Sequence, residues 1–198
     1  MKSGPRLLRL AVVAVALVAS SGWAQTEIPK TFSPVTAEFD HERREVMIPM
    51  RDGVKLRAVV VIPKGATAAP TILSRTPYGS KKPTTQSSSP HAAMVLPLAD
   101  ELLLAAGYIR VYQDVRGRFD SEGDYVMTLP LRGELNRRKV DHTTDTYDTI
   151  EWLLKNVEGN NGRVGLTGVS YPGWLTLMGL VDPHPALVNY ADVRKTAA

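Results

Sequence analysis

The sequence predicts an α/β fold, built on a mostly parallel sheet with an antiparallel hairpin on its N-terminal side. The hairpin is predicted by two apolar runs, residues 45–50 and 54–62, which are joined by Arg51-Asp52-Gly53. An Asp-Gly pair between such runs is a strong hairpin signal, because Gly tolerates positive φ. From Pro70 onward, short apolar runs alternate with segments of helical spacing, which is typical of parallel strands covered by helices on both faces.

The remaining elements follow in chain order. After the hairpin, whose Pro49 indicates an edge position for the first strand, apolar runs and helix-ending glycines set the expected bounds. We expect strands at 70–74, 108–113 and 163–167, and helices at 97–106, from a cap at Thr143 or Thr144 to about 158, and at 171–180. A long polar loop is expected at 80–90 and a Gly-punctuated loop at 114–123.

The N-terminus has the three parts of a secretory signal. Lys2, Arg6 and Arg9 precede an apolar run at 10–19, and Gly22 and Ala24 fit a cleavage site after Ala24. We therefore expect a signal peptide at 1–24, an extended lead-in at 25–41, and a periplasmic or secreted domain at 42–198. The apolar run is shorter than the ~20 residues of a membrane span, and an uncleaved N-terminal anchor is the alternative.

Composition narrows the classes of partner. The net charge of +4 falls to +1 when Lys2, Arg6 and Arg9 are removed, which leaves no basic surplus for nucleic acid or an anionic membrane. The chain has no Cys, so disulfides are excluded. No Gly-x-Gly-x-x-Gly or P-loop follows an early strand and no metal-ligand cluster is visible, so we expect neither a cofactor nor a metal.

The segment with the clearest chemistry is Val164-Gly-Leu-Thr-Gly-Val-Ser-Tyr-Pro-Gly-Trp174, in which a buried strand meets a serine and a helix begins at once. This is the arrangement of a nucleophile elbow, which needs a very small residue two before the serine, here Gly168. Ser170 would then project above the sheet, and the N–H of Tyr171 would face a developing oxyanion. Pro172 replaces the usual second Gly, which the first turn of a helix tolerates. The alternative is a plain strand–Gly–helix connection with an incidental Ser.

These residues resemble the X-prolyl dipeptidyl peptidase and cocaine-esterase superfamily of α/β-hydrolases, and most closely its α-amino-acid ester hydrolases. The resemblance covers about residues 38–187, and the matching segments occur in the family's order. They are Met50-Arg-Asp-Gly-Val-Lys-Leu56, Arg75-Thr-Pro-Tyr-Gly79, Asp114-Val-Arg-Gly-Arg-Phe-Asp-Ser-Glu-Gly-Asp-Tyr-Val-Met-Thr128, Asp145-Thr-Tyr-Asp-Thr-Ile-Glu-Trp152, Gly168-Val-Ser-Tyr-Pro-Gly-Trp174 and Asp182-Pro-His-Pro-Ala-Leu187.

The resemblance implies a secreted serine hydrolase acting on a small acyl ester or peptide. Ser170 would be acylated, and the Tyr171 N–H and the Tyr78 hydroxyl would hold the oxyanion. From the residues alone, the favoured interpretation of Tyr78 is a turn tyrosine packed under the long loop. Arg116 is a candidate for binding a substrate carboxylate or, with Asp120, for holding its loop.

The sequence departs from this family in its base. In α/β-hydrolases an acid and then a histidine follow the serine, but His184, in a helix-ending turn, is here the one histidine after Ser170. The helix at 171–180 would carry His184 ~15 Å from the elbow, and His41, His91 and His142 precede the serine, with His91 and His142 expected in solvent. The sequence after Leu187 becomes polar, so we expect a truncated N-terminal portion of the fold. The alternative function is therefore an inactive fragment lacking the catalytic Asp and His.

Overall fold

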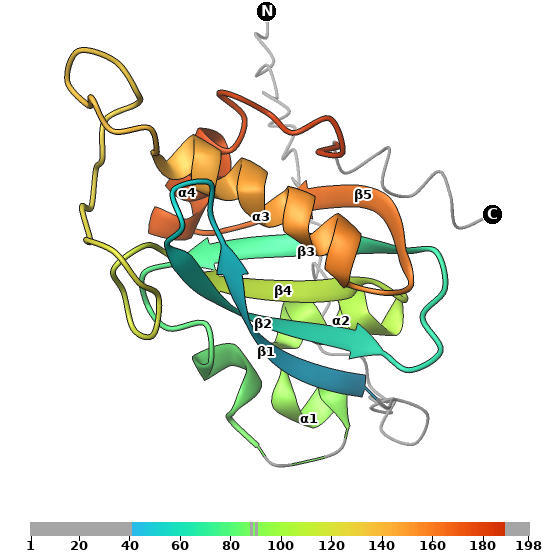
Figure 1. Ribbon diagram of the computed structural model, residues 1–198. Coiled ribbons are helices and arrows are strands. Elements are labelled where there is room, and N and C mark those ends of the chain that lie inside the picture. The colour runs from blue at the N-terminus through green and yellow to red at the C-terminus, as the bar shows by residue number, and fades with distance from the viewer. Residues whose placement is uncertain (1–40, 88, 90, 189–198) are drawn as a thin grey trace, which may run out of the picture. The chain divides into compact units, whose positions relative to one another are not determined.

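The computed structural model describes residues 41–87, 89 and 91–188 (Figure 1). The expected signal peptide and residues 25–40 of the expected lead-in lie outside the described residues. The described elements are β1 His41–Pro49, β2 Lys55–Pro63, β3 Ala69–Thr76, the 3-10 helix η1 Lys82–Thr84, α1 Ala92–Val95, α2 Leu98–Ala105, β4 Ile109–Asp114, α3 His142–Asn156, β5 Asn160–Leu166 and α4 Tyr171–Met178.

The N-terminal hairpin forms as predicted. β1 and β2 pair antiparallel from His41 opposite Pro63 to Pro49 opposite Lys55. The turn between them needs a left-handed residue, and Gly53 supplies it with φ of +87°. β1 forms one edge of the sheet, as Pro49 indicated. It begins at His41, so the last residue of the expected lead-in is part of the sheet.

The five strands lie in the order β1-β2-β4-β3-β5. β2 pairs antiparallel with β4, whereas β3 pairs parallel with both β4 and β5. The sheet is therefore mixed, with its parallel part built from the strands that bear the motifs. Because the carboxyl ends of parallel strands share one edge, the segments that follow β3, β4 and β5 meet there, which positions the site.

Successive residues of β2 point to opposite faces of the sheet, and each face has its own core. Ala58 and Val60 pack in a cluster with Ile150 and Leu153 of α3. Val59 and its neighbour Val61 pack instead in a second cluster, whose other members are Ala92, Leu96, Leu104 and Tyr112. Figure 1 shows α3 on one side of the sheet and α1 and α2 on the other. The prediction of a sheet covered on both faces is confirmed.

The cap of α3 differs from the prediction. Asp141, rather than Thr143 or Thr144, is the N-cap, and its carboxylate accepts from both of their N–H groups at 2.9 Å. The Thr144 hydroxyl in turn accepts from the Asp141 N–H at 2.9 Å, which completes a capping box. Burial disfavours ionisation of Asp141, but the hydrogen bonds from Thr143, Thr144 and Arg132 outweigh it and lower its pKa to about 2. The carboxylate is therefore charged and holds the start of the helix.

Shorter elements also differ from expectation. The loop after β3 contains η1, and the four-residue helix α1 precedes α2. The last helix, α4, ends at Met178 instead of reaching residue 180. Beyond it, Leu187 forms a parallel bridge to Val164 at the outer edge of β5. Among the described residues, no helix is long and apolar enough to cross a membrane.

Candidate active site

A sharp bend places Ser170 between β5 and α4. Its backbone has φ of +61° and ψ of −126°, a region that non-glycine residues avoid. Its side chain is exposed, and the α4 helix begins at the next residue, Tyr171. The backbone strain and the exposure together match the geometry expected of an elbow. The predicted bend is therefore present, while the catalytic role of Ser170 stays a prediction.

The bend is tight because two backbones meet at Gly168. A Cβ at this position would lie 2.3 Å from the carbonyl carbon of Pro172 and 2.4 Å from its oxygen. Only Gly avoids that overlap, as the sequence indicated. Pro172 lies in the first turn of α4, where its missing N–H has no helical partner to lose. Gly168 and Pro172 together let α4 start close above the end of β5.

The two proposed oxyanion donors lie in segments that follow two different strands, β3 and β5. Tyr78 follows the end of β3 and is 53% exposed, so it is not packed beneath the long loop. Its N–H donates to the Thr76 hydroxyl at 3.0 Å, which shapes the turn. Tyr171, directly after the serine, donates its phenol to the Met127 carbonyl. Burial, contact with Tyr125 and the nearby Tyr78 raise the pKa of the Tyr171 phenol.

The turn that carries Tyr78 is anchored to the end of β4. Asp114 at the end of β4 accepts from the Ser80 N–H at 2.6 Å and from its hydroxyl at 2.8 Å. Burial raises the pKa of Asp114, although these hydrogen bonds and Arg57 oppose the rise. The ends of β3 and β4 are thereby tied together beside the elbow, which fixes where Tyr78 emerges.

Arg116 is a structural residue. Its guanidinium is bound to Asp145 at 2.7 Å and to Asp52 at 2.8 Å, and the residue is only 5% exposed. These partners occupy it, so binding of a substrate carboxylate is not what the geometry favours. Asp120 pairs with Arg57 rather than with Arg116. Arg116, paired with Asp145 and Asp52, and Asp120, paired with Arg57, therefore hold the loop separately. The Arg116–Asp120 pair that the sequence suggested does not form.

His142 corrects a further expectation. It is not solvated: it is the first residue of α3 and only 4% exposed, and its ring packs edge-on to Trp174 with centroids 5.2 Å apart. No hydrogen bond of good geometry reaches either ring nitrogen, although the backbone of Val126 and Met127 lies close enough to favour the charged ring. Burial, aided by the positive charge of Arg75, lowers its pKa to about 4. His142 is therefore a neutral aromatic neighbour of α4, and Trp174 is half-buried between it and Tyr171.

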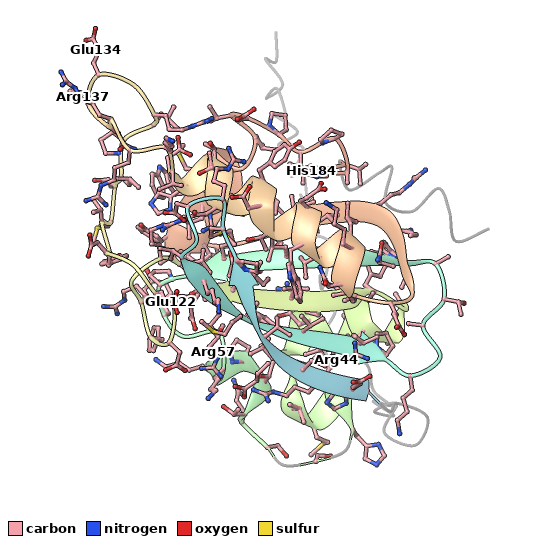
Figure 2. The ribbon with its side chains drawn as sticks, in the orientation of Figure 1. Arg44, Arg57, Glu122, Glu134, Arg137 and His184 are labelled. Atoms are coloured by element: carbon pink, nitrogen blue, oxygen red, sulfur yellow. The ribbon has the colours of Figure 1, made fainter. Side chains whose placement is uncertain are left out.

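Both ring nitrogens of His184 are bound to groups other than Ser170. Its Nε2 lies 2.8 Å from Glu151 of α3, and its Nδ1 accepts from the Ala186 N–H at 3.0 Å. Figure 2 shows His184 beside α3, which carries Glu151. Both ring nitrogens are thus occupied away from Ser170, which agrees with the expectation that His184 is a poor base.

Sequence reasoning missed Arg75, which ties the end of β3 to β4 and to the start of α3. It is 3% exposed at the end of β3 and donates to the Gln113 side chain at 2.8 Å, the His142 carbonyl at 2.8 Å and the Thr146 hydroxyl at 2.9 Å. No periodicity signals a buried arginine, because its partners are distant in sequence. Among the described residues, no group of three or more His, Cys, Asp or Glu side chains is arranged to hold a metal.

Comparisons with known proteins agree on one family. The family-wide pattern of the X-Pro dipeptidyl-peptidase (S15 family) matches residues 52–194. The cocaine esterase of Rhodococcus sp. (strain MB1 Bresler) is 35% identical over 128 residues, which are 65% of this chain and 19% of that protein.

Two solved structures are similar in both sequence and fold. An α-amino acid ester hydrolase is 53% identical with a TM-score of 0.73, over 84% of this chain and 27% of that one. An aminopeptidase from a marine sediment Thaumarchaeota archaeon is 52% identical with a TM-score of 0.72, over 83% of this chain and 27% of that one. The chain thus spans about a quarter of the length of these two proteins.

Proposed function

Because the chain belongs to the X-Pro dipeptidyl-peptidase (S15) family, we propose that it carries the nucleophile of a serine hydrolase that cleaves esters or amides through an acyl-enzyme on Ser170. The observation that carries the proposal is the strained, exposed conformation of Ser170 at the start of α4. Strain of this kind persists only where the surrounding structure imposes it, and it clusters at reactive sites.

The proposed step is acyl transfer. The Ser170 Oγ attacks the substrate carbonyl carbon, the carbonyl oxygen becomes an oxyanion, and the bond to the leaving alcohol or amine then breaks. The Tyr171 N–H and the Tyr78 hydroxyl donate to that oxyanion, where a single preorganised donor is worth about 100-fold or more in rate. The proton of Ser170 passes through a base to the leaving group.

The substrate class is inferred from the relatives. Their names describe an aminopeptidase, an α-amino acid ester hydrolase and a cocaine esterase, which share attack on an acyl carbonyl. We therefore include α-amino-acid esters and X-Pro peptides as substrates of this family member. The signal-like N-terminus supports export to the periplasm or the medium.

A second candidate is a chain that does not turn over by itself. It is favoured by the two histidines nearest the motif: His184 is bound to Glu151, and His142 is buried against Trp174 with no hydrogen bond to the serine. A serine without a base is a weak nucleophile. In this case Ser170 is held in the elbow but is not activated, so the chain alone does not form an acyl-enzyme.

A fluorophosphonate probe tests the nucleophile. We expect covalent labelling of the chain, with the adduct located on Ser170 by peptide mass spectrometry and lost in Ser170→Ala. Ser87→Ala, a serine change in the loop after β3, should label like the wild type. An adduct that survives in Ser170→Ala would refute the proposal. Hydrolysis of p-nitrophenyl acetate then separates the two candidates, because Ser170-dependent turnover excludes the second one.

A further inference from the structure

Arg118 lies where three segments of the site meet. Its Nε donates to the Pro77 carbonyl at 3.3 Å, directly before Tyr78. Its guanidinium carbon is 5.3 Å from the ring centre of Phe119 and 5.1 Å from that of Tyr125. One cation is thereby in contact with the turn after β3, the loop after β4 and the segment that reaches the phenol of Tyr171.

Phe119 provides a second contact between the same segments. Its backbone has φ of +51°, which is costly for a bulky residue. This conformation brings its ring against Gly79, where a Cβ would lie 3.2 Å from the ring carbon Cζ. Gly79 itself has φ of +103°, which glycine adopts without strain, so the costly backbone conformation at this contact is that of Phe119. Such strain is maintained where the packing around it has a purpose.

These contacts reach the backbone of the turn on both sides of Tyr78. Asp114, at the end of β4, binds Ser80 by two hydrogen bonds. Arg118 binds the Pro77 carbonyl, directly before Tyr78, and Phe119 packs against Gly79, directly after it. The exposed phenol of Tyr78 is therefore carried by a turn whose backbone is fixed on both sides. A donor gains its effect on an oxyanion only when its position is fixed before the reaction.

We infer that Arg118 is a positioning residue, which holds the Tyr78 hydroxyl at the oxyanion site through the Pro77 carbonyl and its aromatic contacts. This inference rests on the proposed function of Ser170. Arg118 does not touch the substrate in this role. A planar guanidinium suits it, since it can stack on aromatic rings while its edge donates to a carbonyl.

The test is a double-mutant cycle on the rate at which the fluorophosphonate probe labels Ser170 in the full chain. We expect Tyr78→Phe to slow labelling about 100-fold and Arg118→Met to slow it by at least about 10-fold. If Arg118 acts through Tyr78, Arg118→Met adds almost nothing in the Tyr78→Phe background. A merely structural effect would instead multiply the two losses.

The controls separate the possible failures. Arg137→Met makes the same chemical change at the tip of a protruding loop, which Figure 2 shows away from the sheet, and should leave the rate unchanged. Thermal unfolding reports whether Arg118→Met is folded; if it is not, Phe119→Leu, which removes the aromatic ring, replaces it in the cycle. Slow labelling in Tyr78→Phe with normal labelling in the folded Arg118 variant overturns this inference alone. Absence of any Ser170 adduct in the folded wild-type chain overturns the first candidate function as well and leaves the second, a chain that does not turn over by itself.

Discussion

Replacing Gly168 by Ala tests the elbow by steric means alone. The added Cβ would lie 2.3 Å from the Pro172 carbonyl carbon and 2.7 Å from its Cβ. Carbon atoms reach a comfortable contact only at ~3.5 Å, so the end of β5 and the start of α4 must separate by about 1 Å. The atoms in the way are largely backbone, which cannot rotate aside as a flexible side chain would.

Two effects of known size follow from this displacement. Forcing an extra methyl group into packed structure costs about 1–3 kcal/mol, and contact with backbone favours the upper end. For a chain of this length, a cost of about 3 kcal/mol lowers the unfolding midpoint by roughly 6–12 °C. A misplacement of about 1 Å at the reacting group also slows its reaction by about 100-fold. Gly168→Ala should therefore be less stable and label Ser170 far more slowly.

Calorimetry and the labelling rate measure both effects. Gly173→Ala is the matched control, because its Cβ faces the same contact from α4 but lies 3.1 Å from the Gly168 oxygen. We expect its losses to be clearly smaller. The reasoning would be refuted if Gly168→Ala kept the midpoint and labelling rate of the wild type, or if Gly173→Ala were the worse of the two.

Two further predictions concern buried charge. Burial depresses the pKa of His142 from 6.5 to about 4, so the unfolded chain binds its proton first as the pH falls. Stability should therefore be fully present above pH 6.5 and be lost between pH 6.5 and 4; urea titrations should show a shallower loss in His142→Phe, and equal slopes would contradict the assignment. Arg116→Met leaves Asp145, which is 1% exposed, facing Arg75 at 3.6 Å but without its 2.7 Å contact to Arg116, and should cost about 3–5 kcal/mol in urea unfolding. Arg137→Met is its control, and a loss below about 1 kcal/mol would show that the buried pair is dispensable.

Local signals predicted the features that depend on neighbours in sequence. The hairpin followed from Asp52-Gly53, and the bend at Ser170 followed from Gly168 between a buried strand and a helix. The four-residue helix α1 was missed because it is too short to show helical spacing.

Features that depend on long-range hydrogen bonds were not predictable in this way. His142 was expected in solvent because polar residues surround it. Asp141, Thr143 and Thr144 are nevertheless buried, since they satisfy one another and the start of α3. Arg75, Arg116 and Arg118 bind partners that lie up to 71 residues away, and no spacing rule connects them.

The strand order has a consequence for how the chain assembles during synthesis. β3 lies between β4 and β5, and both of these neighbours are made after it. Until β4 and β5 emerge, the apolar Ile72 and Leu73 of β3 have no strand beside them. β1 and β2 can already pair at this stage. A ribosome paused before Ile109 would therefore present the β1–β2 hairpin followed by β3, whose apolar side chains have no neighbouring strand yet. Chaperones bind exposed apolar segments of this kind.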